Sequence, residues 1–281
     1  MAYTTDVVPE LLEQIEAEFN KRHKKSKALK ALNAKIKDGT ATYHNANLYA
    51  IDVGEMLKEA YKTITGDMLP DGKMYYNIAE RIIKPTIEEK FNLITEITEK
   101  VQNSLNKGAG IGLKAIKPKI DPNRVQGILN RLAEAEQFTE VAWILGEPVV
   151  EFMLNAVDES IRINADAQAR AGMKPKIVRK MESTPILTYI KKVKGKVYGP
   201  YEQTEPMPCA FCMARAGVYD YEDVKNTGND VFLRHAHCRC TVEYYPGDGR
   251  VQNAHTKTWQ EANKSEIQNR IERITSLIDN I

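Results

Sequence analysis

Apolar residues recur every three or four positions through the first two thirds of the chain, which is the spacing of one face of an α-helix. This pattern predicts helices over residues 5–19, 46–64, 86–106, 123–145 and 149–171. We therefore expect a set of amphipathic helices that bury their apolar faces against one another.

The segment 86–106 has the clearest helical pattern. Thr86 and Glu89 have the spacing of an N-terminal capping box and directly follow Pro85. The apolar positions then alternate in steps of four and three, which predicts a seam against another helix. Residues 107–112 contain three glycines and are predicted to be a linker that ends this helix.

The pattern changes after Gly172, where prolines and glycines interrupt the chain too often for long helices. Three short β-like segments remain, at 176–179, 186–190 and 241–245. The lysine-rich segment 191–196 is predicted to be a strand–turn–strand whose lysines protect an edge.

The last segment, 256–281, returns to a helical period. Its isoleucines are spaced four, three, four and three, which favours either packing on a core or binding to a partner helix. They are Ile267, Ile271, Ile274, Ile278 and Ile281. The sequence thus predicts a mainly α protein with a helical domain at 1–172, a small α+β module at 173–250 and a C-terminal helix at 251–281.

Composition excludes several broad classes. The 281 residues carry 40 basic and 38 acidic side chains, so the net charge of +2 gives no global signal for nucleic acid or membrane. No apolar run reaches the roughly 18 residues of a membrane span, and the N-terminus has no secretory pattern. We therefore expect a soluble protein of intracellular origin.

Basic residues are nevertheless concentrated in one place. The segment 21–37 has eight lysines and arginines and no acidic residue. Such a face can bind phosphates, although a solvated helix surface is the alternative. The candidate nucleic-acid contacts are Lys21, Arg22, Lys24, Lys25 and Lys27.

All four cysteines fall between positions 209 and 240. Two cysteines three positions apart, followed after a gap by a second cluster of His and Cys, are typical of a tetrahedral zinc site. The candidate metal ligands are Cys209, Cys212, His235, Cys238 and Cys240. Four protein ligands would close the coordination shell, which predicts a structural zinc site rather than a catalytic one.

Other interpretations of the same residues remain open. Cys209 could form a disulfide with Cys212, with Cys238 or with Cys240, or the thiols could be unpaired. A zinc deaminase needs an upstream His-x-Glu or Cys-x-Glu, and the chain has neither. A zinc-supported nuclease would need a general base outside the metal site, for which only His237 and His255 are near in sequence.

The order of motifs around the cysteines resembles the minor capsid or head-morphogenesis proteins of tailed phages and prophages of Gram-positive bacteria, which are related to the Mu F-type family. The resemblance covers about residues 170–260. Besides Cys209–Cys212, it rests on the segments Ala171–Arg179, Ala216–Tyr219, Asp230–Val242 and Tyr245–Gly249.

This resemblance implies a low-copy structural protein of the virion head, made in the host cytoplasm and without enzymatic activity. It implies the portal or the major capsid protein as partner, with non-specific contact to packaged phage DNA. Self-association is also consistent with the isoleucine stripe, whereas no membrane contact is expected. By position, the resemblance matches Cys209, Cys212, His235, Cys238 and Cys240, and it leaves His237 as a surface histidine. A sequence-selective zinc-module DNA-binding protein is the alternative function, followed by the nuclease.

Overall fold

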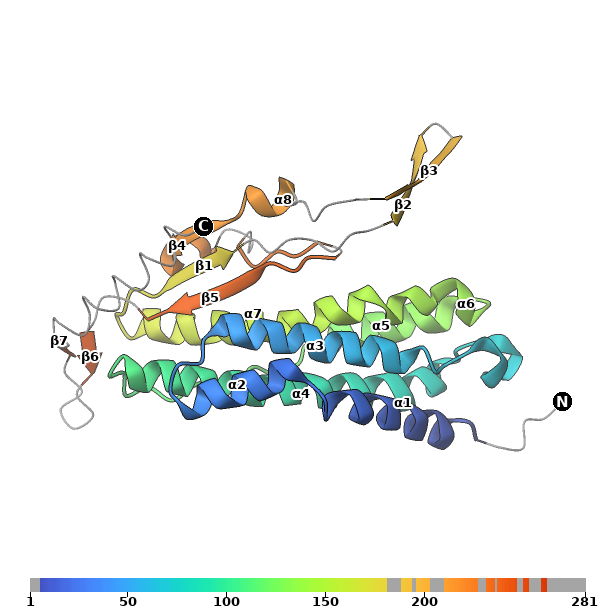
Figure 1. The fold of residues 1–281 in the computed structure, drawn as a ribbon, viewed down its shortest axis with the longest axis horizontal. Helices are drawn as coiled ribbons and strands as arrows, with labels where there is room; N and C mark the ends of the chain where they lie inside the picture. The colour runs from blue at the N-terminus through green and yellow to red at the C-terminus, as the bar shows by residue number, and fades with distance from the viewer. Residues whose placement is uncertain are drawn as a thin grey trace.

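The computed structural model describes residues 6–180, 188–193, 196–202, 210–226, 231–235, 237–246, 250–252 and 259–261. Within these residues the protein is mainly helical, with one three-stranded antiparallel sheet and two pairs of short antiparallel strands (Figure 1). The helical part comprises α1 (Val8–His23), α2 (Lys27–Lys37), α3 (Tyr43–Tyr61), α4 (Tyr76–Gly108), α5 (Pro122–Glu134), α6 (Phe138–Val141) and α7 (Glu147–Arg170), with 3₁₀ turns η1 (Gly66–Met68), η2 (Pro70–Gly72) and η3 (Ala142–Leu145). The predicted mainly α class is confirmed.

The long helices lie side by side along the long axis of the molecule (Figure 1). Helices α3 and α7 approach each other closely at Gly54, where an added Cβ would lie 2.7 Å from the Cα of Val150. Glycine at this position therefore lets two backbones meet, and the fully buried Val150 fills the space beside it.

Buried polar side chains also join these helices. Tyr43 of α3 donates a hydrogen bond to Gln102 of α4 at 2.8 Å, and Gln102 donates to Asn106 at 2.7 Å. Gln168 of α7 donates to the same Asn106 oxygen at 2.9 Å. Because a buried polar group is costly without its partner, this chain of bonds fixes how the three helices align.

The prediction that a helix begins at Thr86 is wrong. Helix α4 starts ten residues earlier and includes Pro85. Thr86 is buried, and its hydroxyl bonds to the Ile82 carbonyl at 2.8 Å and to the Tyr61 hydroxyl at 2.6 Å. The apolar stripe continues across the proline through Ile83 and Ile87, and its burial outweighs the roughly 3 kcal/mol cost of an interior proline.

The prediction of one helix over 123–145 is also wrong, because this segment forms α5, α6 and η3. Leu132 and Phe138 are both buried, but six residues separate them. A continuous helix would place them roughly 120° apart around its axis, on different faces. The chain must therefore leave the helix after Glu134 to bury Phe138.

A three-stranded antiparallel sheet follows the helices, with strand order β4-β1-β5. Its strands are β1 (Lys176–Lys180), β4 (Gly217–Asp220) and β5 (Thr241–Tyr245). Asn47 of α3 donates to the carbonyl of Val242 at 2.9 Å, which fixes β5 against the bundle. The apolar cores of the bundle and the sheet are continuous through Ile177 and Tyr244.

The remaining described elements are short. The predicted strand–turn–strand is confirmed as the hairpin of β2 (Thr188–Val193) and β3 (Lys196–Glu202). Helices α8 (Ala210–Met213) and α9 (Tyr221–Val224) flank β4. No helix in the described part of the chain is long and apolar enough to cross a membrane.

The predicted C-terminal helix is wrong at its beginning. Arg250–Gln252 and Trp259–Glu261 form the paired strands β6 and β7. Residues 262–281, which contain the isoleucine stripe, lie outside the described residues.

Candidate metal centre

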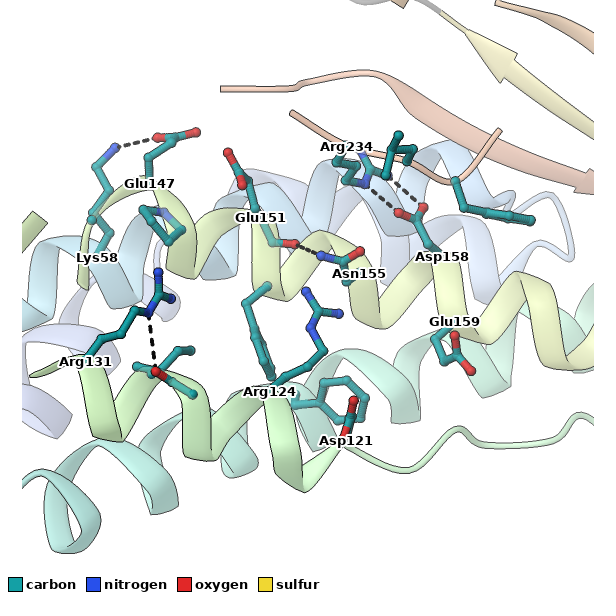
Figure 2. Close-up of a pocket in the computed structure, with 18 of the residues that line it drawn as sticks. Lys58, Asp121, Arg124, Arg131, Glu147, Glu151, Asn155, Asp158, Glu159 and Arg234 are labelled. Carbon is teal, nitrogen blue, oxygen red and sulfur yellow. Dashed lines mark hydrogen bonds and ion pairs between the residues drawn. The ribbon is translucent and has the colours of Figure 1, made fainter. Parts of the chain in front are cut away.

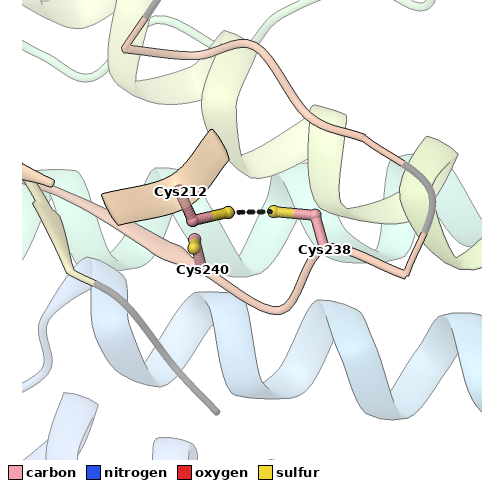
Figure 3. A group of neighbouring side chains, drawn as sticks. All are labelled: Cys212, Cys238 and Cys240. Atoms are coloured by element: carbon pink, nitrogen blue, oxygen red, sulfur yellow. Dashed lines mark hydrogen bonds between the residues drawn. The ribbon is translucent and has the colours of Figure 1, made fainter. Parts of the chain in front are cut away.

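Three of the five predicted metal ligands meet in the structure. Cys212 lies on α8, whereas Cys238 and Cys240 lie in the loop that leads into β5 (Figure 3). All three are at most 2 % exposed, and their Sγ atoms all lie within 4.8 Å of one another. They are close enough to bind one metal ion.

The spacing of the sulfur atoms fits metal ligands better than a disulfide. The three thiols are free, and the Sγ atoms of Cys212 and Cys238 are 3.8 Å apart. A disulfide would bring them to about 2.05 Å. Two thiolates bound tetrahedrally at about 2.3 Å from one ion would lie about 3.8 Å apart, as these two do.

His235 is the fourth candidate that the structure places at this site. Its Nε2 atom is 3.1 Å from the Sγ atom of Cys212, and its ring packs edge-on against Phe211 with centroids 5.3 Å apart. The Cys238 amide donates to the His235 carbonyl at 3.0 Å, so a tight turn holds histidine and cysteine together. Cys209, the fifth candidate, lies outside the described residues.

His237 occupies the turn between these ligands. It has a positive φ of 62°, which is unusual for a residue other than glycine. Its amide donates to Glu151 at 2.9 Å, and its imidazole Nδ1 is 3.6 Å from a carboxylate oxygen of Glu147. The side chain is 42 % exposed. These contacts turn the His237 ring toward α7.

Two arginines beside the sulfur atoms were not predicted from the sequence. Arg179 of β1 is 2 % exposed, and its Nη2 atom lies 3.6 Å from the Cys238 sulfur and 3.8 Å from the Cys212 sulfur. Arg234 places Nη1 3.9 Å from the Cys238 sulfur. Nothing in the sequence indicated that Arg179 lies next to the cysteines, because 59 residues separate it from Cys238 and only folding brings the two together.

These neighbours set the protonation of the thiols. The hydrogen bond from Cys240, together with the charges of Arg234 and Arg179, lowers the pKa of Cys238 to about 4 although burial opposes it. Burial raises the pKa of Cys212, and the bond to Cys238 followed by burial raises that of Cys240. The guanidinium charges thus favour the thiolate form of Cys238, and a bound cation would replace the remaining thiol protons.

Two arginines connect the cysteine loop to the helices through salt bridges. Arg234 forms a bidentate pair with Asp158 of α7, at 2.5 and 2.7 Å, and both side chains are at most 5 % exposed. Arg239 pairs with Glu147 of α7 and, at 2.7 Å, with Glu55 of α3. The loop that carries His235, Cys238 and Cys240 is therefore fixed to the bundle by one arginine directly before His235 and by another between the two cysteines.

The predicted nucleic-acid contacts lie at the turn between α1 and α2, on the side of the bundle away from the three-stranded sheet (Figure 1). Lys21 and Arg22 pair with Glu18 of the same helix, at 3.1 and 2.6 Å. The other three side chains are exposed: Lys24, Lys25 and Lys27. The turn thus presents basic groups to solvent, and the structure does not test whether they bind nucleic acid.

Comparison with protein-family models, curated proteins and solved structures finds no match to this chain.

Proposed function

We propose that this protein is a structural component of a phage head, of the Mu F-like head-morphogenesis type, in which the cysteine cluster holds a structural zinc ion. The observation that carries the proposal is the meeting of Cys212, Cys238 and Cys240 within the motif order that resembles this family. The position of His235 next to Cys212 supports a closed shell of nitrogen and sulfur ligands. Such a shell has no open position for substrate, which favours assembly over catalysis.

Zinc would act here as a cross-link. The ligands come from α8 and from the loop before β5, and Arg234 and Arg239 fix that loop to the bundle. A bound ion would therefore hold α8, the loop and the bundle in one arrangement. The rigid surface formed in this way is the part that we propose docks on the portal or the major capsid protein.

Metal analysis tests the site. Protein prepared under reducing conditions should contain about one equivalent of zinc by mass spectrometry of the element. Cys238→Ser should lose it, whereas Met213→Ser, an exposed position next to a ligand, should retain it. Cys209→Ser and His235→Ala then identify the fourth ligand, since the variant at the true ligand should lose most of the zinc.

Mass spectrometry of purified particles tests the function. The protein should be present in virions produced by the strain that carries it, in far fewer copies than the major capsid protein. Particles that lack it altogether would contradict the structural role, even if the zinc site is confirmed.

The exposed basic turn supports contact with packaged DNA. In a plot of the logarithm of the DNA-binding constant against the logarithm of the salt concentration, each phosphate contact contributes about 0.9 to the slope. Charge reversal of Lys24, Lys25 and Lys27 should therefore reduce the magnitude of this slope by about 2.7. Binding that is selective for one sequence and survives moderate salt would instead favour the alternative of a zinc-module regulator.

A further inference from the structure

A wide groove runs between α5 and α7 (Figure 2). Arg234 and His237 of the cysteine loop border it at one side, but none of the candidate metal ligands lines it. Its apolar lining includes Phe91 of α4, Ile128 of α5 and Phe152 of α7, each at most 5 % exposed. The cavity has a volume of about 1690 Å³, whereas sites for small molecules usually occupy about 300–1,000 Å³. Its size therefore indicates a polypeptide segment as occupant.

The two walls of the groove differ in charge, because α5 contributes two arginines whereas α7 contributes four carboxylates and one arginine, Arg162. Arg124 and Arg131 of α5 point toward α7, and Glu159 of α7 points back into the gap (Figure 2). Among the described residues, neither arginine forms a salt bridge: Arg124 lies over the Phe152 ring at 5.1 Å, and Arg131 donates to the Gly127 carbonyl at 3.3 Å. The basic wall therefore has charge available for a partner.

Exposed apolar side chains also line the groove. Trp143 is 61 % exposed and Leu233 is 43 % exposed, although both are large enough to prefer burial. Large side chains of this kind are frequent anchors at binding surfaces. An occupant with an apolar face would cover them.

The chain contains a segment with complementary chemistry. On a helical projection of 267–281 the five isoleucines form one stripe, with Arg270 and Arg273 on one flank and Glu272 and Asp279 on the other. Fifteen helical residues span about 22 Å, and the part of α7 from Glu147 to Arg162 that lines the groove spans about 24 Å.

We propose that the groove between α5 and α7 is the docking site of the chain's own C-terminal segment, residues 262–281. The isoleucine stripe covers the apolar floor, the arginine flank faces α7, and Glu272 and Asp279 face the arginines of α5. Docking within one chain is favoured because the covalent connection gives the segment an effective concentration of about the millimolar range. This inference does not depend on the phage assignment or on the metal.

Trypsin susceptibility of the full-length protein tests the proposal, because the isoleucine-bearing part of the docked segment, residues 267–281, contains two cleavage sites, Arg270 and Arg273. Release of the C-terminal peptides is followed by mass spectrometry. We expect Arg124→Glu/Arg131→Glu and, separately, Ile274→Glu to accelerate cleavage at both sites by about tenfold, the effect of losing one well-placed contact. Addition of Asp279→Arg to Arg131→Glu should restore part of the resistance to trypsin, because the two substitutions exchange the charges of the proposed ion pair.

Lys24→Glu/Lys25→Glu serves as the control, since it reverses two exposed charges outside the groove and should leave the rate unchanged. Circular dichroism confirms that each variant keeps its helices. Equal cleavage rates in the wild type, the groove variants and Ile274→Glu would overturn the proposal. Protection that increases with protein concentration, together with a dimer in light scattering, would also overturn it by assigning the groove to a second copy.

Discussion

The helical bundle and the cysteine loop are held together by different forces. The bundle is stabilised by apolar side chains that recur along each helix and by close backbone contact at Gly54, where α3 and α7 meet. The cysteine loop touches the same two helices through charged groups, with Arg234 on Asp158 and Arg239 on Glu147 and Glu55.

This difference determines how each region should respond to damage. Apolar contacts are numerous and partly replaceable, so one poor contact costs a limited amount. A buried charge depends on one specific partner. When that partner is removed, the charge is neither hydrated by water nor neutralised by an opposite charge. Single substitutions at the ion pairs of the cysteine loop should therefore cost more stability than single substitutions in the apolar core of the bundle.

Removal of the metal should give the largest effect and the clearest separation of the two regions. Structural zinc supplies on the order of 10 kcal/mol of binding energy to its fold. In hydrogen exchange, a chelator or Cys240→Ser should expose the amides of residues 231–246 and spare those of α4. Equal loss of protection in both regions would show that the bundle cannot fold without the loop.

Asp158→Asn should rank next, at a cost of about 3–5 kcal/mol in the free energy of unfolding, because Arg234 stays buried without its countercharge. Urea denaturation measures this change. The neighbouring Glu159→Gln breaks a more exposed pair with Arg162 and should change stability by less than about 0.5 kcal/mol. Similar losses in the two variants would contradict the special role of the buried pair.

Gly54→Ala tests the bundle and should cost about 1–3 kcal/mol, because the new methyl group overlaps Val150. Gly127→Ala in α5 is the matched control. An added Cβ there meets no atom within 4 Å, so the substitution should stabilise the helix by about 0.5–1 kcal/mol. Thermal unfolding should therefore shift in opposite directions for the two variants.

The pH dependence of the Arg239 contact should give the smallest effect. Burial opposes ionisation of Glu147, but the hydrogen bond and charge of Arg239 outweigh it and lower the carboxyl pKa below its ordinary value of 4.5. The ion pair thus contributes its stability above pH 4.5 and loses it as pH falls through the lowered pKa. The wild type should exceed Glu147→Gln in the free energy of unfolding by about 1 kcal/mol at pH 7, and this difference should decrease as the pH falls below 4.5.

Sequence reasoning succeeded best where local pattern and tertiary packing agree. It located α1, α3 and α7 and the strands β1 and β5, because each has an unbroken period of apolar residues. It failed at Thr86 and at the break before Phe138, where distant partners decide the outcome. Thr86 and Glu89 have the spacing of a capping box, but the apolar residues on both sides of Pro85 are buried against the same core. The helix therefore begins before Thr86, at Tyr76.

The candidate site divides in the same way. The spacing of the cysteines and of His235 predicted which side chains could share a metal, since ligand knuckles are local in sequence. Nothing local pointed to Arg179 or Asp158, because each reaches the site only after β1 and α7 pack against the loop.

By itself, the sequence determined the helical periods, the positions of the turns and the set of potential ligands, all of which depend on residues within a few positions of each other. Only the tertiary structure decided that the Cys238 thiol lies next to two guanidinium groups and that a buried ion pair fixes the loop to α7. The physical reason is that a charge acts through distance in space and through burial, and the linear order of residues records neither.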